Sequence, residues 1–145
     1  MISSRIRKFV KLSSAEKWLV IRALILLQLN WFLVRIKPLE EVINASTSQR
    51  LIKQSQLEET RIPELVDSAS RLTRWTDNCL LRGLTSKRLL LAAGYRANLG
   101  IGVKQDEYGV LCAHAWIERS DGSALTEELV DQREFQRLNI YTKRK

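Results

Sequence analysis

The hydrophobic periodicity of the chain changes at Gly94, and this change limits the possible folds more than any other sequence feature. Before Gly94, leucines recur at helical spacings behind three capping candidates, Thr76, Asp77 and Asn78. Gly94 then ends the run in the manner of a C′ glycine. The spacing therefore predicts a helix with Cys79 at its N-terminus.

The sequence after Gly94 alternates between apolar and polar residues, as strands do. A polar turn separates two such stretches, and a Ser-Asp-Gly-Ser run is a further hairpin signal. We expect strands at residues 95–103, 110–118 and about 124–130. A turn at residues 104–107 joins the first two strands, and a hairpin turn at residues 120–123 precedes the third. Helices followed by a small antiparallel meander predict an α+β fold. We expect the polar C-terminal residues 133–145 to fray.

The longest apolar stretch runs from Trp18 to Ile36. It is long enough to span a membrane, but it contains arginine, glutamine and asparagine side chains. On a helical wheel Lys17, Gln28 and Arg35 form one narrow polar stripe. The pattern favours a buried helix, with contact with a membrane surface as the alternative.

Local signals divide the rest of the N-terminal half. A capping serine with Glu16 precedes the apolar stretch, and Pro38 ends it. A loop, a polar helical segment and a helix opened by Pro63 follow. We expect the loop at residues 44–50, the polar helical segment at residues 51–59 and the helix opened by Pro63 at residues 63–73. We therefore expect a helical extension over residues 1–62 and a core over residues 63–145, packed as one compact unit.

The net charge of +8 comes from 24 Lys and Arg against 16 Asp and Glu, and it is concentrated at the two ends of the chain. Residues 1–11 carry four cations and no acid, and residues 143–145 carry three more. Residues 12–142 are almost balanced, so the count predicts no basic face for nucleic acid on the folded body. The N-terminus lacks the pattern of a secretory signal. We expect a cytoplasmic protein with reduced thiols.

Cys79 is the candidate nucleophile. A thiol attacks as the thiolate, and the unpaired N–H groups of a helix N-terminus favour that anion. The only histidine, His114, lies 35 residues later in a predicted strand, on one face with Cys112 and Trp116. Papain-like and transglutaminase-like enzymes use a cysteine at a helix start with a histidine on a strand that crosses it.

Structural roles remain open for the same residues. A cysteine at a helix start is often a small buried hydrophobe, and a lone histidine is often structural. Cys112 is a second candidate nucleophile, but it gains nothing from a helix dipole. A disulfide between Cys79 and Cys112 is disfavoured in a reducing compartment.

Four segments together resemble the lasso-peptide leader peptidases, which are microcin-processing, transglutaminase-like cysteine proteases. The resemblance covers residues 63–130, and the segments are Asp77 to Arg82, Lys87 to Gly94, Gly100 to Val103 and Ala113 to Glu118. It implies a papain-like core in which the cysteine helix packs on a small antiparallel sheet, with residues 63–145 as the protease domain. The apolar helix ending at Pro38 is similar to the short N-terminal extension of that family.

The resemblance implies an endopeptidase that removes the leader from a ribosomally made precursor before an ATP-dependent cyclase closes the ring. Cys79 would attack the scissile carbonyl, and His114 would take and return the proton. The third family residue is an acid on the next strand. The hairpin at 119–123 is one residue longer than usual, so this position moves from Thr126 to Glu127. Alternatives are Glu128, Asp121 and Glu118.

The remaining predictions concern residues that would contact the substrate or the oxyanion. The backbone N–H of Cys79 is the natural oxyanion donor, and Asn78 or Trp75 is a candidate for the second. Arg82 would bind substrate or pair with Glu118. Trp116 is a further candidate for contact with the substrate or the oxyanion. The resemblance implies no metal or other cofactor.

Residues 1–62 contain no strand triplet, so the leader-recognition domain fused to some family members is not expected. The implied partners are the precursor leader, a separate leader-recognition protein and the cyclase. The alternative functions are a basic-armed, non-catalytic module that binds a membrane or nucleic acid, and a transglutaminase-like acyltransferase.

Overall fold

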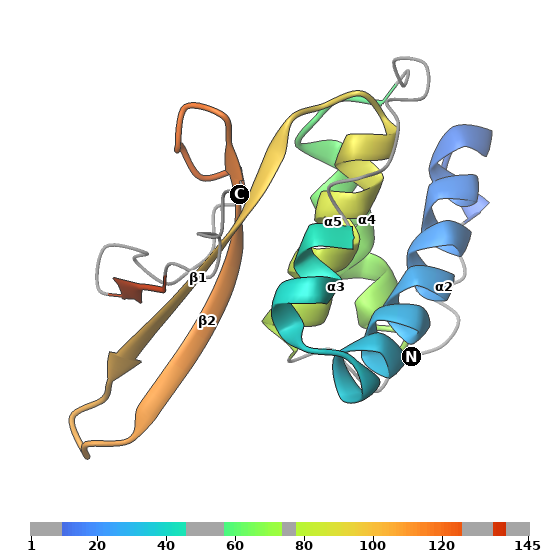
Figure 1. Cartoon of the computed structure of the whole chain (residues 1–145). Helices are drawn as coiled ribbons and strands as arrows, with labels where there is room; N and C mark the ends of the chain where they lie inside the picture. Colours follow the sequence, from blue (N-terminus) through green and yellow to red (C-terminus); the bar gives the residue numbers. More distant parts are fainter. Residues whose placement is uncertain (1–9, 46–56, 74–77, 126–134, 139–145) are drawn as a thin grey trace.

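A computed structural model describes residues 10–45, 57–73, 78–125 and 135–138. Within these ranges it contains four helices and one antiparallel sheet, which confirms the predicted α+β class. The helices α2–α5 gather on one side, and the long hairpin of β1 and β2 lies beside them and extends past their ends (Figure 1). Helix α5 lies between α2 and the sheet and packs against both.

Helix α2, Ser14–Ile36, begins at a capping box. The Ser13 hydroxyl accepts from the Glu16 backbone N–H at 3.2 Å, and the Ser13 N–H donates to the Glu16 carboxylate at 2.8 Å. One face is buried by Val20, Ala23, Leu27 and Asn30. The expectation of a buried helix holds for this face only. The other side is exposed because α2 lies at the outer edge of the helical layer, away from the sheet (Figure 1).

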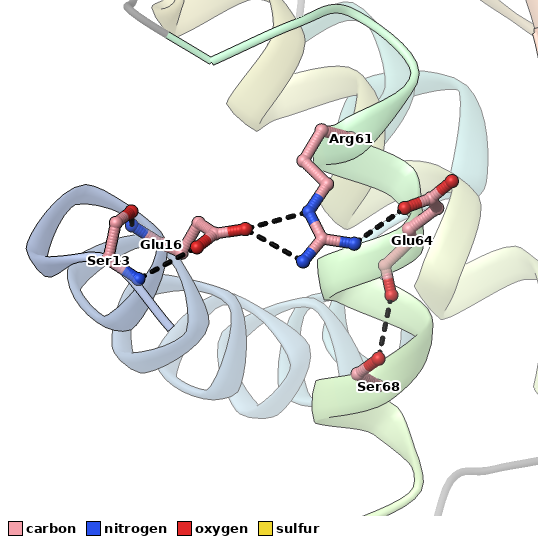
Figure 2. A network of polar contacts seen from close by, with 5 residues as sticks. All are labelled: Ser13, Glu16, Arg61, Glu64 and Ser68. Carbon is pink, nitrogen blue, oxygen red and sulfur yellow. Dashed lines mark hydrogen bonds and ion pairs between the residues drawn. The ribbon is translucent and has the colours of Figure 1, made fainter. Parts of the chain in front are cut away.

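An ionic network joins the start of α2 to helix α4, Arg61–Ser70 (Figure 2). The Arg61 guanidinium binds the Glu16 carboxylate at 2.7 and 2.8 Å, and it binds Glu64 on its own helix at 2.8 Å. The Ser13 backbone N–H and Arg61 both donate to Glu16 and lower the pKa of this carboxyl. Glu64 and Glu16 in turn raise the pKa of Arg61. The network therefore ties the start of α2 to α4.

The segments on either side of residues 46–56 differ from expectation. A short helix, α3, covers Leu39–Ala45, where the sequence predicted only a loop from residue 44. Residues 57–60 form turns, not the end of a polar helix, and the rest of that predicted segment lies outside the described residues. Helix α4 begins two residues before Pro63, because proline is tolerated throughout a first turn. It is shorter at its C-terminal end than predicted.

Helix α5, Cys79–Ala92, matches the sequence prediction at both ends. The Asn78 side chain caps the helix by accepting from the Leu81 backbone N–H at 3.1 Å. Gly94 has a φ of 92°, the left-handed conformation that a C′ glycine supplies. The leucines of α5 are largely buried, so α5 is the central helix of the core.

Strands β1, Ala97–Gln105, and β2, Leu111–Arg119, form the long hairpin. The turn lies two residues later than predicted, because Asp106 nucleates it. The Asp106 carboxylate accepts from the backbone N–H groups of Tyr108 and Val110 at 2.9 and 2.8 Å. The register pairs Gly102 with His114 and Gly100 with Trp116.

The third strand differs from the predicted one. Only an isolated bridge between Glu118 and Ala124 extends the sheet beyond β2, and residues 126–130 lie outside the described part. The observed strand β3 is Gln136–Arg137, which pairs with β1 and gives the order β2-β1-β3. It falls in the segment that the sequence predicted would fray. The domain boundary at residue 62 stays a prediction.

Candidate functional site

Cys79 is the first residue of α5, as the sequence predicted. Its thiol is free and half-buried, and its side chain packs against the hydrophobic core. Asn78, the candidate oxyanion donor, has its side chain engaged in the helix cap. Cys112 is also free and half-buried, so the structure contains no Cys79–Cys112 disulfide. Cys79 lies at the N-terminus of α5, which is the positive end of the helix dipole.

Close packing at Gly83, one turn after Cys79, joins the first half of α5 to the sheet. A Cβ atom at Gly83 would lie 2.5 Å from Leu99 Cδ1 and 3.9 Å from Ala115 Cβ. Only the absence of a side chain allows the helix to approach these strands so closely. Ala115 is the direct neighbour of His114 on β2, so the first half of the cysteine helix packs against the strand that carries the histidine, on the face opposite the imidazole.

His114 lies on the sheet face opposite Ala115. Alternation along β2 puts it on one side with Trp116, and the two rings stack with centroids 6.0 Å apart. Phe135, just before β3, lies 5.4 Å from the imidazole centroid and 6.5 Å from that of Trp116. The imidazole therefore has aromatic neighbours on this face. The pairing of the Cys79 thiol with His114 stays a prediction.

Two glycines of β1 make room for Trp116. A Cβ at Gly100 would overlap the indole ring, and a Cβ at Gly102 would lie 3.1 Å from the ring and 2.7 Å from Phe135 Cβ, so the ring lies directly on the strand backbone. Trp116 is buried, and its Nε1–H donates to Glu118 at 2.7 Å. A contact between Trp116 and substrate stays a prediction.

Glu118 is buried at 4% exposure and connects two side chains. Its second carboxylate oxygen accepts from Arg137 of β3 at 2.6 Å. The carboxylate is thus bonded to Trp116 and Arg137. Sequence reasoning missed Arg137 and Phe135 because it assigned them to a frayed tail, and the only available signal was their composition, one aromatic and one cation in a polar segment.

Arg82 makes a contact that the sequence did not predict. It pairs with Asp67 of α4 at 2.7 Å, and Asp67 also binds Arg71 at 2.7 Å. The expected alternative, a pair between Arg82 and Glu118, is not the arrangement observed. Arg82 therefore ties α5 to α4, and a role in substrate binding stays a prediction.

The structure describes only some of the candidates for the third catalytic residue, the acid. Glu127 and Glu128 lie outside the described residues, as does Trp75, a candidate oxyanion donor. Asp121 forms the turn after β2, where the Ser123 hydroxyl and backbone N–H donate to its carboxylate at 2.6 and 2.8 Å and lower its pKa. The five residues from His114 to the end of β2 span roughly 16 Å, which puts Asp121 far from the imidazole. Asp121 is a turn residue, and Glu127 stays the predicted acid.

An open groove of about 640 Å³ lies at the far end of the hairpin, between β1, the turn and β3. Lys104 and Gln136 line it, together with the acids Asp106 and Glu107. The Lys104 ammonium lies 4.9 Å above the ring of Phe135, which itself contacts His114. The groove therefore adjoins the aromatic cluster around the histidine. Across the described ranges, no cluster of three His, Cys, Asp or Glu residues forms a metal site.

The sequence model of the Transglutaminase-like superfamily matches residues 23–139, which include α5, the hairpin and β3. Searches of curated proteins and of solved structures give no significant match. The matched region includes both Cys79 and His114.

Proposed function

The chain belongs to the transglutaminase-like superfamily, and from this premise we propose that it is a cysteine endopeptidase that removes the leader from a ribosomally made lasso precursor peptide. Membership is consistent with a cysteine protease or an acyltransferase. The observation that carries the proposal is the position of Cys79, whose free thiol begins α5 inside the matched region that also contains His114. The four leader-peptidase-like segments favour the protease.

The proposed reaction uses Cys79 and His114 as a pair. The Cys79 thiol loses its proton to the imidazole, and Sγ attacks the scissile carbonyl carbon. The imidazolium returns the proton to the leaving amine nitrogen as the peptide bond breaks, which leaves a thioester. Water then attacks the thioester, the leader departs as a carboxylic acid, and Cys79 regains its proton. Glu127 would orient the imidazole, and the Cys79 backbone N–H would bind the oxyanion.

The proposal extends to partners and location. The substrate is the leader segment of a precursor, presented by a separate leader-recognition protein in the cytoplasm. An ATP-dependent cyclase would then use the released peptide.

The test is cleavage of the cognate precursor by the purified chain in the presence of the recognition protein. We expect Cys79→Ala to abolish cleavage, because no other thiol replaces the nucleophile, while Cys112→Ala serves as the matched control and retains it. His114→Ala should be inactive, and Glu127→Gln should be slower. Full activity of Cys79→Ala would overturn the proposal.

Mass spectrometry of the leader separates the two reaction classes. Hydrolysis adds the mass of one water to the released fragments, whereas transfer to an amine adds the amine to the leader and no water. An amine adduct as the main product would replace the peptidase with an acyltransferase.

A further inference from the structure

The outer side of α2 presents a continuous apolar stripe to solvent. Its large side chains recur every three or four residues along the whole helix, and the most exposed are Trp18 at 65%, Ile25 at 62% and Ile36 at 58%. The full stripe consists of Trp18, Ile21, Ile25, Leu29, Phe32 and Ile36. This stripe lies opposite the face of α2 that packs on α4 and α5. A continuous exposed apolar patch of this kind marks a contact surface.

Cations border this stripe on both edges. On a helical wheel Arg22 lies along one edge and Lys17 and Arg35 along the other, and the Arg35 guanidinium lies 4.1 Å over the Trp31 ring. The one acid in α2, Glu16, is engaged by Ser13 and Arg61. The long stems of these cations can cover apolar surface while their charges reach outward.

The sequence before α2 adds charge of the same sign. Residues 1–11 contain Arg5, Arg7, Lys8 and Lys11 and no acid. An apolar stripe with cationic edges, next to a cationic segment, is complementary to a surface that is apolar within and anionic at its boundary.

We propose that α2 docks the protein on an anionic lipid bilayer, with its axis in the plane of the membrane and its apolar stripe among the acyl chains. By length and composition α2 is able to cross a bilayer. Its opposite face argues for the interfacial position, because Val20, Ala23 and Leu27 are buried in the core. The Asn30 amide also donates to Thr85 of α5 at 2.9 Å within the protein. A spanning helix would lose these contacts.

Co-sedimentation of the full chain with lipid vesicles tests the docking. We expect binding to vesicles of phosphatidylcholine with phosphatidylserine, weaker binding at high salt, and little binding to phosphatidylcholine alone. The variant Ile25→Gln/Phe32→Gln should lower the partition coefficient by roughly tenfold or more. Arg22→Gln/Arg35→Gln should lower it by roughly fivefold for each charge removed. Far-ultraviolet circular dichroism confirms that each variant is folded.

Two exposed apolar residues outside α2 supply the matched control. Leu72→Gln/Tyr108→Gln removes side chains of 54% and 83% exposure and should bind vesicles like the parent. Equal loss in this control, or unchanged binding by the α2 variant, would overturn the proposal. Resistance of the bound protein to alkaline carbonate would show a spanning helix. A lipid-free dimer that Ile25→Gln/Phe32→Gln dissociates would show that a second copy covers the stripe. Either result also overturns the proposal, and neither bears on leader cleavage.

Discussion

The indole of Trp116 donates a hydrogen bond of 2.7 Å to Glu118, two residues later on the same face of β2. Both side chains are buried, and Arg137 binds the other carboxylate oxygen. This pair therefore links the aromatic neighbours of His114 to strand β3.

Removal of the carboxylate should destabilise the sheet. Glu118→Ala leaves the buried indole N–H without its acceptor, so we expect the free energy of unfolding to fall by about 2 kcal/mol. Urea titration measures this, and Glu107→Ala in the exposed turn is the control that changes little. Glu118→Gln keeps an acceptor and should lose less. Equal stability of the Glu118→Ala and Glu107→Ala proteins would show that the bond is energetically neutral.

The packing of α5 on the sheet makes Gly83 sensitive to one added methyl group. Leu99 is fully buried and has little room to move, so overpacking in Gly83→Ala should cost about 2 kcal/mol. Better helix propensity returns about 1 kcal/mol. In a Leu99→Val background the same change should cost less, because valine lacks the Cδ1 atom that the new Cβ would meet. A double-mutant cycle by urea unfolding measures this coupling, and strict additivity would contradict the contact.

The bonds to Glu16 predict acid sensitivity. Its pKa is lower in the folded protein than its ordinary value of 4.5, because Ser13 and Arg61 donate to the carboxylate. Its stabilising contribution is therefore present above that value and is lost as the pH falls through the folded pKa. We expect the thermal midpoint of Glu16→Gln to lie below that of the parent at neutral pH and to approach it in acid. A constant gap across this range would refute the assignment.

Burial of Lys87 predicts a second pH window. Desolvation lowers the pKa of Lys87 from its ordinary 10.5 to about 8. Between these values the unfolded chain binds more protons than the folded one, so the free energy of unfolding rises with pH. Urea unfolding across this window should show a steeper rise for the parent than for Lys87→Met. Identical slopes would mean that Lys87 is as solvated in the folded state as in the unfolded one.

Local features were predictable from the sequence, and features set by distant contacts were not. The cap at Asn78, the glycine at 94 and the alternation along β2 each depend on neighbouring residues, and they placed Cys79 and His114 on the correct elements. Strand β3 is only two residues long and exists through pairing with β1, which no local pattern encodes. Asp67, the observed partner of Arg82, belongs to another helix.

The sequence favoured a buried α2 and left contact with a membrane surface as the alternative. A buried helix and a helix at the edge of the protein can have the same hydropathy. Hydropathy depends only on which side chains the helix contains, and it does not report whether another element packs over them. One face of α2 packs as expected, and the opposite stripe is exposed within the described chain.

The left-handed residue at Gly94 has a consequence for how the protein folds. Residues 93–96 alone connect α5 to β1, so the cysteine helix and both strands of the hairpin form one continuous stretch of chain. Contacts of short sequence separation form early and at low entropic cost. The bond between Asn30 and Thr85, by contrast, closes a loop of 55 residues. We therefore expect the candidate thiol and imidazole to share one cooperative folding unit, onto which α2 docks late, and amide hydrogen exchange should protect that unit longest.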